Sequence, residues 1–447
     1  MPLPTAARPD LGTAALLAAY RAAGFISIPF IPLSLVYRAL RRKETMRRAR
    51  ERFGGSTIAR PPGRVFWVHA ASVGETNAVM PLIDRLAALG IAVVFTSVTI
   101  TAAEIARRRL PPGAVHQFSP VDVPLLVSRF LNHWQPECAI FVESELWPAT
   151  IMKLHDRHIP LVVVNARLSQ RSFESWQRLP GLSRTLFSRI PLCLAQTAKD
   201  GERYAGLGAP QVAVTGNLKF DAPPPAASEA GLAAFRKLAE GRPLWVAAST
   251  HPGEEEIVAA AHRQIRRKIP AALTVIAPRH PTRGADIRTA LTGLGFGVAQ
   301  RSLNEPVTPA TDIYLADTLN ELGIFYRVAP VAFLGGSLIP HGGQNPIEPA
   351  RLDTVILHGP HVHNFEEVYA AIDSGGGAIP VKDAPSLASE VTALLENPAA
   401  VRRKAEAAER ALRPLCGAMD RTIVALAPYL GETGNRLEGA RPAALVR

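Results

Sequence analysis

The sequence predicts an α/β protein made of two successive domains, each with a parallel sheet. From Arg64 onward, short apolar runs alternate with amphipathic segments, which is the pattern of buried parallel strands joined by crossover helices. Three consecutive prolines within residues 222–228 interrupt this pattern, which then starts again. At about 150 residues per domain, a chain of 447 residues has room for two or three domains.

The expected strands of the first domain are residues 65–69, 91–97, 138–142, 160–164, 190–195 and 211–215. Those of the second are residues 244–248, 272–277, 312–316, 331–335, 354–358 and 377–381. The expected organisation is an N-terminal segment 1–52, a domain 53–221, a linker 222–242, a domain 243–430 and a flexible tail 431–447. Ligands of open α/β sheets bind beyond the carboxyl ends of the strands. The strand-to-helix turns, in a cleft between the domains, are therefore the expected active site.

Composition excludes several classes of protein. A hydrophobic content of 47% is too high for a disordered chain. Three widely spaced cysteines rule out a disulfide scaffold and a cysteine-rich zinc site. The net charge of +12 points to an anionic partner, which composition alone leaves open between nucleic acid, a membrane surface and a phosphorylated substrate.

Half of this charge lies near the N-terminus. The stretch Arg38–Arg52 carries a net +6 and follows an apolar segment, residues 22–37, that is interrupted by Pro29 and Pro32. Basic residues directly after an apolar segment favour the cytoplasmic side of a membrane and attract anionic headgroups. We expect a short membrane anchor or an interfacial helix; the alternative is a helix packed on the protein with a solvated basic face. Nucleic acid fits poorly because aromatic residues for base stacking are not interleaved with the basic ones.

The first candidate turn is residues 69–75, directly after an expected strand. Glu75 falls where a helix begins, and a carboxylate there can act as a general base toward an attacking hydroxyl. The structural alternative is that Ser72 and Glu75 form the S-x-x-E motif that caps a helix and needs no substrate.

Three further residues of the first domain follow expected strands. Glu143 can hold a lysine or orient a substrate hydroxyl, or it can belong to an ion pair that only stitches the loop. Lys219 can neutralise a leaving phosphate or pair with Glu143, and Arg167 is a further candidate for anion binding. Both cations could instead be salt-bridged surface residues.

The turns of the second domain favour phosphate. Ser249 and Thr250 precede a helix start, and Arg279 can make bidentate contacts to an anion. Asn345 is expected as a helix N-cap, with Pro346 at the first helical position and Glu348 two residues later. A carboxylate at Glu348 can bind ribose hydroxyls or merely complete a cap.

Stock motifs for other chemistries are missing. The sequence has no G-x-x-x-x-G-K-[ST] loop, no H-E-x-x-H zinc motif and no Asp-x-Asp pair that would hold a metal with a diphosphate. We therefore expect a metal-free, anion-binding cleft, with no metal and no cofactor.

Eight turn motifs in order resemble one family, the 3-deoxy-D-manno-octulosonic acid (Kdo) transferases of lipopolysaccharide assembly, of the WaaA/KdtA type. The motifs are HAASVGET, ESELWP, NARLS, TGNLKFD, STHPGEE, PRHP, ADTLNEL and GGSLIPHGGQNPIE, which run from about His69 to Glu348.

The resemblance implies a GT-B glycosyltransferase with two Rossmann-like domains facing across a cleft. The first would bind the acceptor and the second CMP-Kdo. It implies inverting transfer of Kdo from CMP-Kdo to the lipid A precursor lipid IVA, at the cytoplasmic side of the cell inner membrane, with an anionic membrane surface and no nucleic acid as partner.

Residue roles follow by motif. Glu75 is similar to the family's general base, and Glu143 and Lys219 to its transition-state stabilisers. Arg167, Ser249 and Thr250 are candidate contacts to substrate anions. The implied CMP-binding residues are Pro278, Arg279, Leu319, Asn320, Glu321, Asn345, Pro346, Ile347 and Glu348.

One residue departs from the family pattern: Asn320 stands where relatives commonly have glycine, so its side chain can alter the backbone of a CMP-binding turn. Two alternatives remain open at the level of sequence. One is another GT-B transferase that uses a UDP-sugar and a lipid acceptor; the other is a non-catalytic protein that binds anionic lipids.

Overall fold

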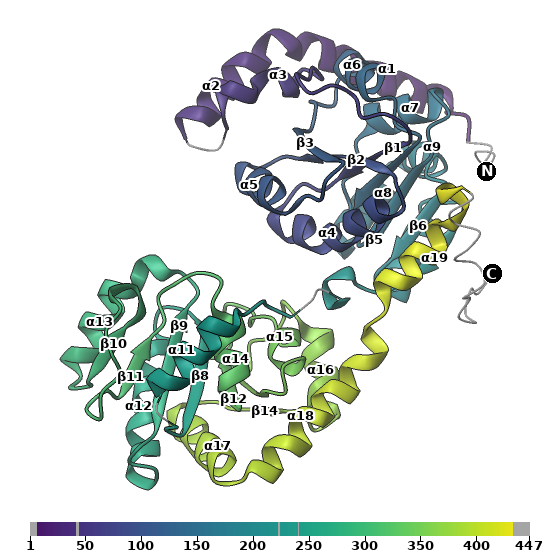
Figure 1. The fold of residues 1–447 in the computed structure, drawn as a ribbon. Coiled ribbons are helices and arrows are strands. Elements are labelled where there is room, and N and C mark those ends of the chain that lie inside the picture. Colours follow the sequence, from purple (N-terminus) through teal and green to yellow (C-terminus); the bar gives the residue numbers. More distant parts are fainter. Residues whose placement is uncertain (1–6, 42–43, 222–223, 240, 432–447) are drawn as a thin grey trace. The chain divides into compact units, whose positions relative to one another are not determined.

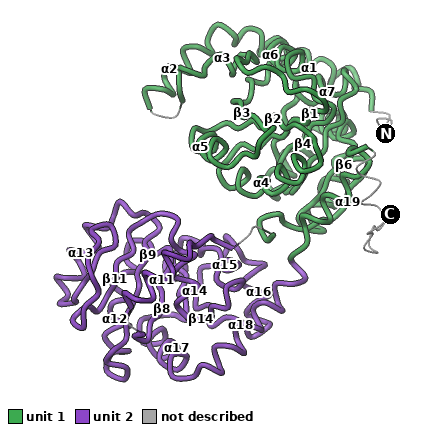
Figure 2. The backbone as a smooth tube through the Cα atoms, in the orientation of Figure 1, with its two compact units in different colours: residues 1–222, 416–447 green, residues 223–415 purple. Residues whose placement is uncertain are grey.

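The structure, a computed structural model, describes residues 7–41, 44–221, 224–239 and 241–431. The chain divides into two compact units (Figure 2): residues 1–222 with 416–447 form unit 1, and residues 223–415 form unit 2. Each unit is built on one sheet, with helices on both of its faces (Figure 1).

Unit 1 has a seven-stranded parallel sheet in the order β3-β2-β1-β4-β5-β6-β7. Its strands are β1 (Val65–His69), β2 (Ala92–Ser97), β3 (Ala114–Phe118), β4 (Cys138–Val142), β5 (Leu161–Ala166), β6 (Leu192–Ala195) and β7 (Val212–Val214). Its α-helices are α1 (Leu11–Ser27), α2 (Ile31–Leu40), α3 (Ala49–Arg52), α4 (Val73–Ala88), α5 (Ile100–Arg109), α6 (Pro124–Trp134), α7 (Pro148–Asp156), α8 (Gln170–Gln177), α9 (Pro180–Phe187), α10 (Ala198–Gly206) and α19 (Ala418–Leu430). Three short 3-10 helices are Ile28–Phe30, Met46–Arg48 and Leu218–Asp221.

Unit 2 also has a seven-stranded parallel sheet, in the order β10-β11-β9-β8-β12-β13-β14. Its strands are β8 (Leu244–Thr250), β9 (Leu273–Pro278), β10 (Val298–Gln300), β11 (Ile313–Leu315), β12 (Val331–Leu334), β13 (Val355–His358) and β14 (Ala378–Pro380). Its α-helices are α11 (Glu229–Ala239), α12 (Glu254–Lys268), α13 (Gly284–Gly293), α14 (Leu322–Val328), α15 (Ile347–Ala350), α16 (Glu366–Ser374), α17 (Ala384–Glu396) and α18 (Pro398–Leu412). Its 3-10 helices are Pro281–Arg283, Arg301–Leu303 and Arg413–Leu415.

Alternate residues of the strands supply the cores on the two faces of each sheet. In β1, Phe66 and Val68 belong to one buried cluster, whereas Val65 and Trp67 belong to the cluster on the other face. A strand buried on both sides reads as a continuous apolar run. Every strand predicted from such a run is present, including the partly exposed edge strands β7 and β14. The prediction of an α/β protein with two parallel-sheet, Rossmann-like domains is confirmed.

The predicted domain boundaries need two corrections. Residues 229–239, expected to be linker, form α11, because Leu232 and Phe235 are buried in unit 2 and the Phe235 ring packs on Phe325. Residues 418–430, expected to be in the second domain, form α19 and belong to unit 1. Parts of the expected linker and nearly all of the expected tail, residues 222–223, 240 and 432–447, lie outside the described residues.

The apolar N-terminal segment forms a helical stretch, Leu11–Leu40, that is long and apolar enough to cross a membrane by length and composition. One side of it packs on unit 1, where Leu35 joins a small cluster with Val123 and Leu126, and the Tyr20 hydroxyl donates to Asp122 (2.8 Å). Its other residues leave large side chains exposed: Leu11, Phe25, Ile26, Phe30, Leu33, Val36, Tyr37 and Leu40.

The basic stretch Arg38–Arg52 is not exposed throughout, whereas a run that only binds headgroups would have all of its basic side chains in solvent. Arg52 is buried and donates a hydrogen bond to the Glu44 carboxylate (2.8 Å) and another to the Ser119 carbonyl. These two contacts tie the chain after α2 to the end of the edge strand β3. Arg42 and Lys43 lie outside the described residues.

Candidate active site

Glu75 lies in the first turn of α4, at the carboxyl end of β1. One carboxylate oxygen accepts the Ser72 hydroxyl (2.6 Å) and the other accepts the Ala71 backbone N–H (2.8 Å). The Ser72 hydroxyl oxygen in turn accepts the backbone N–H of Glu75. The helix cap predicted as the structural alternative is therefore present, and it holds the carboxylate in one place.

Burial raises the pKa of the Glu75 carboxyl above its ordinary value. The hydrogen bonds from Ser72 and Ala71 oppose this rise, while the negative charges of Glu143 and Glu145 add to it. A carboxylate whose pKa is raised is a better proton acceptor than one at the surface. The cap and a general-base role are therefore compatible on one side chain.

Glu143 directly follows β4 and pairs with Lys219. Its carboxylate accepts the Lys219 ammonium at 2.8 Å, so the contact proposed from the sequence is present. The backbone of Glu143 has φ +60°, a conformation that costs a residue other than glycine free energy and is frequent at functional sites. β1 and β4 are neighbours where the strand order of the sheet reverses, which is the usual ligand position in this architecture.

The turn that carries Lys219 is held by groups that the sequence did not single out. The Asn165 side chain accepts the Leu218 backbone N–H (2.9 Å), and the Asp221 carboxylate accepts the N–H groups of Gly417 and Met419 at the start of α19. Arg421 of α19 donates to the Thr215 carbonyl (2.8 Å). The C-terminal helix thus positions the lysine; polar residues inside the NARLS and TGNLKFD motifs were the available signal.

Two other unit 1 residues at this edge of the sheet differ in their surroundings. His69 is the last residue of β1 and is buried. Its Nδ1 is hydrogen-bonded to the Thr96 hydroxyl (2.8 Å), and its Nε2 lies 3.8 Å from the Glu145 carboxylate. Arg167 follows β5, is exposed and makes no hydrogen bond or ion pair with a described residue. Its guanidinium is therefore available to an anion.

Unit 2 has a pocket of about 250 Å³ at the carboxyl ends of β8, β9 and β11. It brings together six of the residues predicted from the sequence. They are Ser249, Pro278, Arg279, Leu319, Asn320 and Glu348. Thr250 is fully buried and donates to Glu255, so it does not line the pocket.

The polar pair of this pocket is Arg279 and Glu348. Burial raises the pKa of the Glu348 carboxyl, and a hydrogen bond from Asn345 and the charge of Arg279 oppose the rise. The Asn345 amide donates to Glu348 (3.2 Å) and its oxygen accepts the Ile347 N–H (3.0 Å). The helix begins one residue later than predicted, with Pro346 as N-cap, because Asn345 bonds to the N–H two residues on.

Four predicted CMP-binding residues do not line the pocket. Asn345, Pro346 and Ile347 shape the turn that carries Glu348. The Glu321 carboxylate, also outside the lining, accepts the Arg301 guanidinium (2.8 Å) and the Thr318 hydroxyl. The hydrogen bond from Arg301 lowers the pKa of Glu321, which favours a structural ion pair there.

Asn320 has φ +63°, so the turn requires the left-handed conformation that glycine adopts readily. Asparagine tolerates this conformation far better than other residues, which explains how the departure is accommodated.

We expect Asn320→Gly to change the free energy of unfolding by no more than about 0.5 kcal/mol, and Asn320→Val to lower it by roughly 1–3 kcal/mol. Urea unfolding of both variants measures this. Equal effects of the two substitutions would contradict the backbone argument.

Comparison with known proteins agrees with the site. A family model described as 3-deoxy-D-manno-octulosonic-acid transferase (kdotransferase) matches residues 47–222. The 3-deoxy-D-manno-octulosonic acid transferase of Haemophilus influenzae is 36% identical over 391 residues, covering 86% of this chain and 91% of that protein. The enzyme of the same name from Bordetella pertussis is 34% identical over 392 residues, with coverages of 85% and 91%.

Among solved structures, the UDP-GlcNAc 2-epimerase of Neisseria meningitidis, bound to UDP-GlcNAc, aligns with a TM-score of 0.56 and 14% identity. The alignment covers 82% of this chain and all of that one, which supports the fold.

Two parallel seven-stranded sheets, each with candidate site residues at its carboxyl edge, define the GT-B fold of two Rossmann-like domains. The similarity over most of the chain narrows the class further: the chain belongs to the 3-deoxy-D-manno-octulosonic acid (Kdo) transferase family. It is therefore an enzyme, and the alternative of a non-catalytic lipid-binding protein is wrong. The cleft in which the two domains are expected to face each other stays a prediction.

Proposed function

We propose that the enzyme transfers Kdo from CMP-Kdo to the lipid A precursor lipid IVA, inverting the anomeric carbon and using no metal. Membership of the Kdo transferase family supports the sugar, and the resemblance of the motifs supports donor and acceptor. The observation that carries the mechanism is Glu75, a buried carboxylate of raised pKa held by two hydrogen bonds at the carboxyl end of β1.

In the proposed step, a hydroxyl oxygen of the acceptor bonds to the anomeric carbon of Kdo while the bond from that carbon to the phosphate oxygen of CMP breaks. Glu75 takes the hydroxyl proton, and CMP leaves with the electron pair of the broken bond. One carboxylate oxygen of Glu75 accepts the Ser72 hydroxyl and the other accepts the Ala71 N–H. Each oxygen keeps a second lone pair that can take the incoming proton. A single displacement of this kind inverts the configuration.

Lys219 and Glu143 are proposed to stabilise the charge that develops in the transition state. The ion pair at 2.8 Å holds the ammonium in a fixed position before the reaction, so little reorganisation is needed when negative charge appears. Arg167, exposed and unpartnered among the described residues, is proposed to bind the carboxylate of the donor sugar.

Unit 2 is proposed to bind the CMP part of the donor. Arg279 offers a guanidinium to the phosphate, and Glu348 offers a carboxylate to the ribose hydroxyls, in one pocket. Leu319 is exposed beside them and supplies an apolar surface for the base.

The N-terminal helices are proposed to lie on the cytoplasmic face of the cell inner membrane. Tyr20, Leu17 and Leu35 fix one side of the stretch to unit 1, while its other side exposes large apolar side chains. A helix docked in this way on a folded domain suits a position in the membrane interface better than a span.

Incubation of the full chain with lipid IVA and CMP-Kdo, followed by mass spectrometry of the lipid, tests the proposal. We expect the mass to increase by whole Kdo residues, with strong inhibition by CMP and weak inhibition by UDP. Transfer should persist in EDTA, because Lys219 and Arg279 supply the positive charge. Transfer from a UDP-sugar but not from CMP-Kdo would contradict the donor, and a loss in EDTA that Mg²⁺ restores would contradict the metal-free step.

A further inference from the structure

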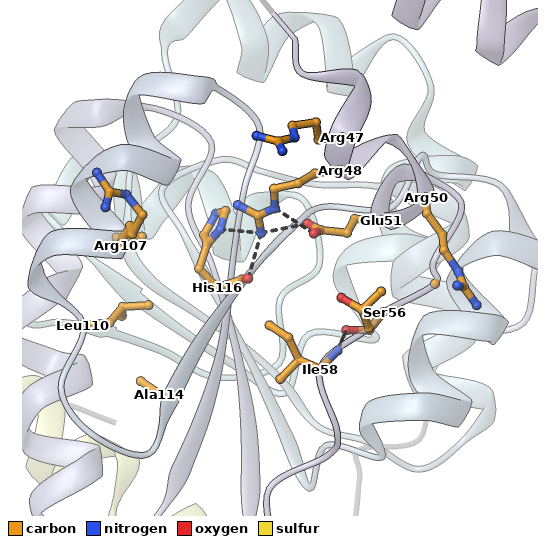
Figure 3. A pocket seen from close by; sticks show the side chains of 13 residues that line it. Arg47, Arg48, Arg50, Glu51, Ser56, Ile58, Arg107, Leu110, Ala114 and His116 are labelled. Carbon is orange, nitrogen blue, oxygen red and sulfur yellow. Dashed lines mark hydrogen bonds and ion pairs between the residues drawn. The ribbon is translucent and has the colours of Figure 1, made fainter.

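A second pocket of unit 1, of about 510 Å³, lies beside the edge strand β3 (Figure 3). Three segments far apart in sequence line it: residues 47–58 after α2, the end of α5, and β3 itself. Its volume falls in the range of small-molecule sites, about 300–1,000 Å³. Glu75, Glu143 and Lys219 are not among the residues that line it. The pocket is therefore separate from the candidate active site.

The pocket is strongly basic. Four arginines line it, against one acidic residue, Glu51. The side chains of Arg47, Arg50 and Arg107 are exposed and make no hydrogen bond or ion pair with a described residue. Their positive charges are free to bind an anion.

Arg48 and Glu51 form the fixed part of the wall. Arg48 donates to both oxygens of Glu51 (2.7 and 2.9 Å) and to the carbonyl of His116 (2.9 Å) (Figure 3). Its guanidinium also lies over the Phe118 ring. Glu51 also accepts the Phe118 backbone N–H (2.7 Å). The single carboxylate of the pocket is thus already bonded on both oxygens and competes little with an incoming anion.

His116 completes this wall as a neutral side chain. Burial, together with the charges of Arg48 and Arg52, lowers the pKa of His116 to about 3. Because arginine only donates, His116 Nδ1 accepts from Arg48 (3.0 Å), so Nε2 carries the proton toward the Ser97 hydroxyl (2.9 Å). The positive charge of the pocket therefore comes from the arginines at any pH near neutrality.

The rest of the lining is apolar. Ile58, Ala106, Leu110 and Ala114 form part of the wall beside the arginines. A site that joins free guanidinium groups to aliphatic surface suits an amphiphile with a phosphoryl group better than a fully hydrated ion.

The pocket is also connected to the apolar N-terminal helices. Glu44 lies 3.8 Å from Arg38 near the end of α2 and 2.8 Å from Arg52, whose guanidinium packs on the same Phe118 ring as Arg48. Leu33, Val36, Tyr37 and Leu40, the exposed apolar side chains of α2, therefore belong to the helix that these ion pairs tie to the pocket wall.

We propose that this pocket binds the phosphomonoester headgroup of a membrane lipid, outside the active site. The inference deepens the membrane association proposed above and is independent of the transfer reaction. Arg47, from the segment after α2, and Arg107, from α5, bind the phosphoryl oxygens, while the aliphatic wall covers the adjoining part of the lipid.

The test compares two double variants of the full chain with equal loss of charge. Arg47→Gln with Arg107→Gln removes two pocket cations; Arg108→Gln with Arg171→Gln removes two exposed arginines of unit 1 that do not line the pocket. Calorimetric titration with inorganic phosphate reads the anion site without a membrane. Flotation with phosphatidylcholine vesicles containing phosphatidic acid, or made equally negative with phosphatidylglycerol, reads the preference for a phosphomonoester.

We expect the pocket variant to weaken phosphate binding at least about tenfold and to abolish the preference for phosphatidic acid. The control variant should stay within about twofold, because charges outside the pocket are screened. Equal loss in both variants, or no loss in either, would overturn the proposal.

Two further results separate the sources of the anion. Phosphate binding that depends on the pocket without any preference for phosphatidic acid would identify free phosphate as the ligand and overturn the lipid assignment. If the wild-type chain floats with neither vesicle type, the proposed membrane association fails, and with it the assignment to a lipid headgroup; the phosphate titration then still reports whether the pocket binds anions.

Discussion

Glu75→Gln is expected to lower the rate of Kdo transfer by about 10²–10⁴-fold, the usual contribution of a general base, without lowering stability. The glutamine amide keeps both cap contacts, since its oxygen can accept the Ala71 N–H and its nitrogen can donate to the Ser72 oxygen. Transfer assays on lipid IVA and thermal unfolding of the same preparation measure the two effects.

The stability of this variant follows from the sign of the pKa shift. Burial raises the folded-state pKa of Glu75, so the ionised carboxylate is less favourable in the folded chain than in the unfolded one. The protonated carboxyl favours the folded chain. The stability that Glu75 contributes in acid is therefore lost as the pH rises from the pKa of the unfolded chain through the higher pKa of the folded one. At neutral pH, Glu75→Gln should keep or raise the melting temperature, and this gain should vanish in acid.

Ser72→Ala is the matched control for the cap. It removes the hydroxyl bond that lowers the Glu75 pKa, so the pKa rises further and the acidic limb of the pH–rate profile moves to higher pH. It also costs about 1 kcal/mol of stability as a lost N-cap. Near-normal turnover of Glu75→Gln, or a limb that Ser72→Ala leaves in place, would refute the general-base role.

The sequence predicts every strand of both sheets except β3 and β10. Both lie at a sheet edge, but so do β7 and β14, which are predicted, so edge position alone does not explain the misses. The residues of β3 supply a reason. In β3, Ala114, Val115 and His116 are only partly buried, so the run AVHQF lacks the continuous apolar character of a strand covered on both faces.

Some parts of the candidate site are likewise predictable from the sequence and others are not. Turn residues such as Glu75, Glu143 and Lys219 are predictable because they directly follow apolar runs whose carboxyl ends share one edge of a parallel sheet. The role of α19 is not predictable, because a helix nearly 200 residues after Lys219 in the sequence returns to hold its turn through Asp221. Local pattern carries no information on such a contact.

Lys219→Met is expected to lower the rate of transfer by about 10²–10³-fold, the cost of removing one preorganised group that stabilises charge in the transition state. The loss should fall on kcat more than on KM, because the charge develops only as the bond to CMP breaks. Lys199→Met, which removes an exposed lysine of α10 in the same unit, is the matched control and should retain full activity.

Stability should change little in Lys219→Met. The Lys219 side chain is 34% exposed and that of Glu143 is 19% exposed, and ion pairs open to solvent contribute at most about 1 kcal/mol. A large fall in the melting temperature would therefore show that the pair holds the fold rather than the reaction.

A double-mutant cycle with Glu143→Gln separates the two proposed functions of the pair. If Glu143 acts by holding the ammonium at 2.8 Å, then Glu143→Gln lowers the rate only while Lys219 is present, and the double variant is no slower than Lys219→Met alone. Strict additivity of the two losses would instead give Glu143 a contact of its own with the substrate. The kinetic coupling thus tells a positioning carboxylate from a catalytic one.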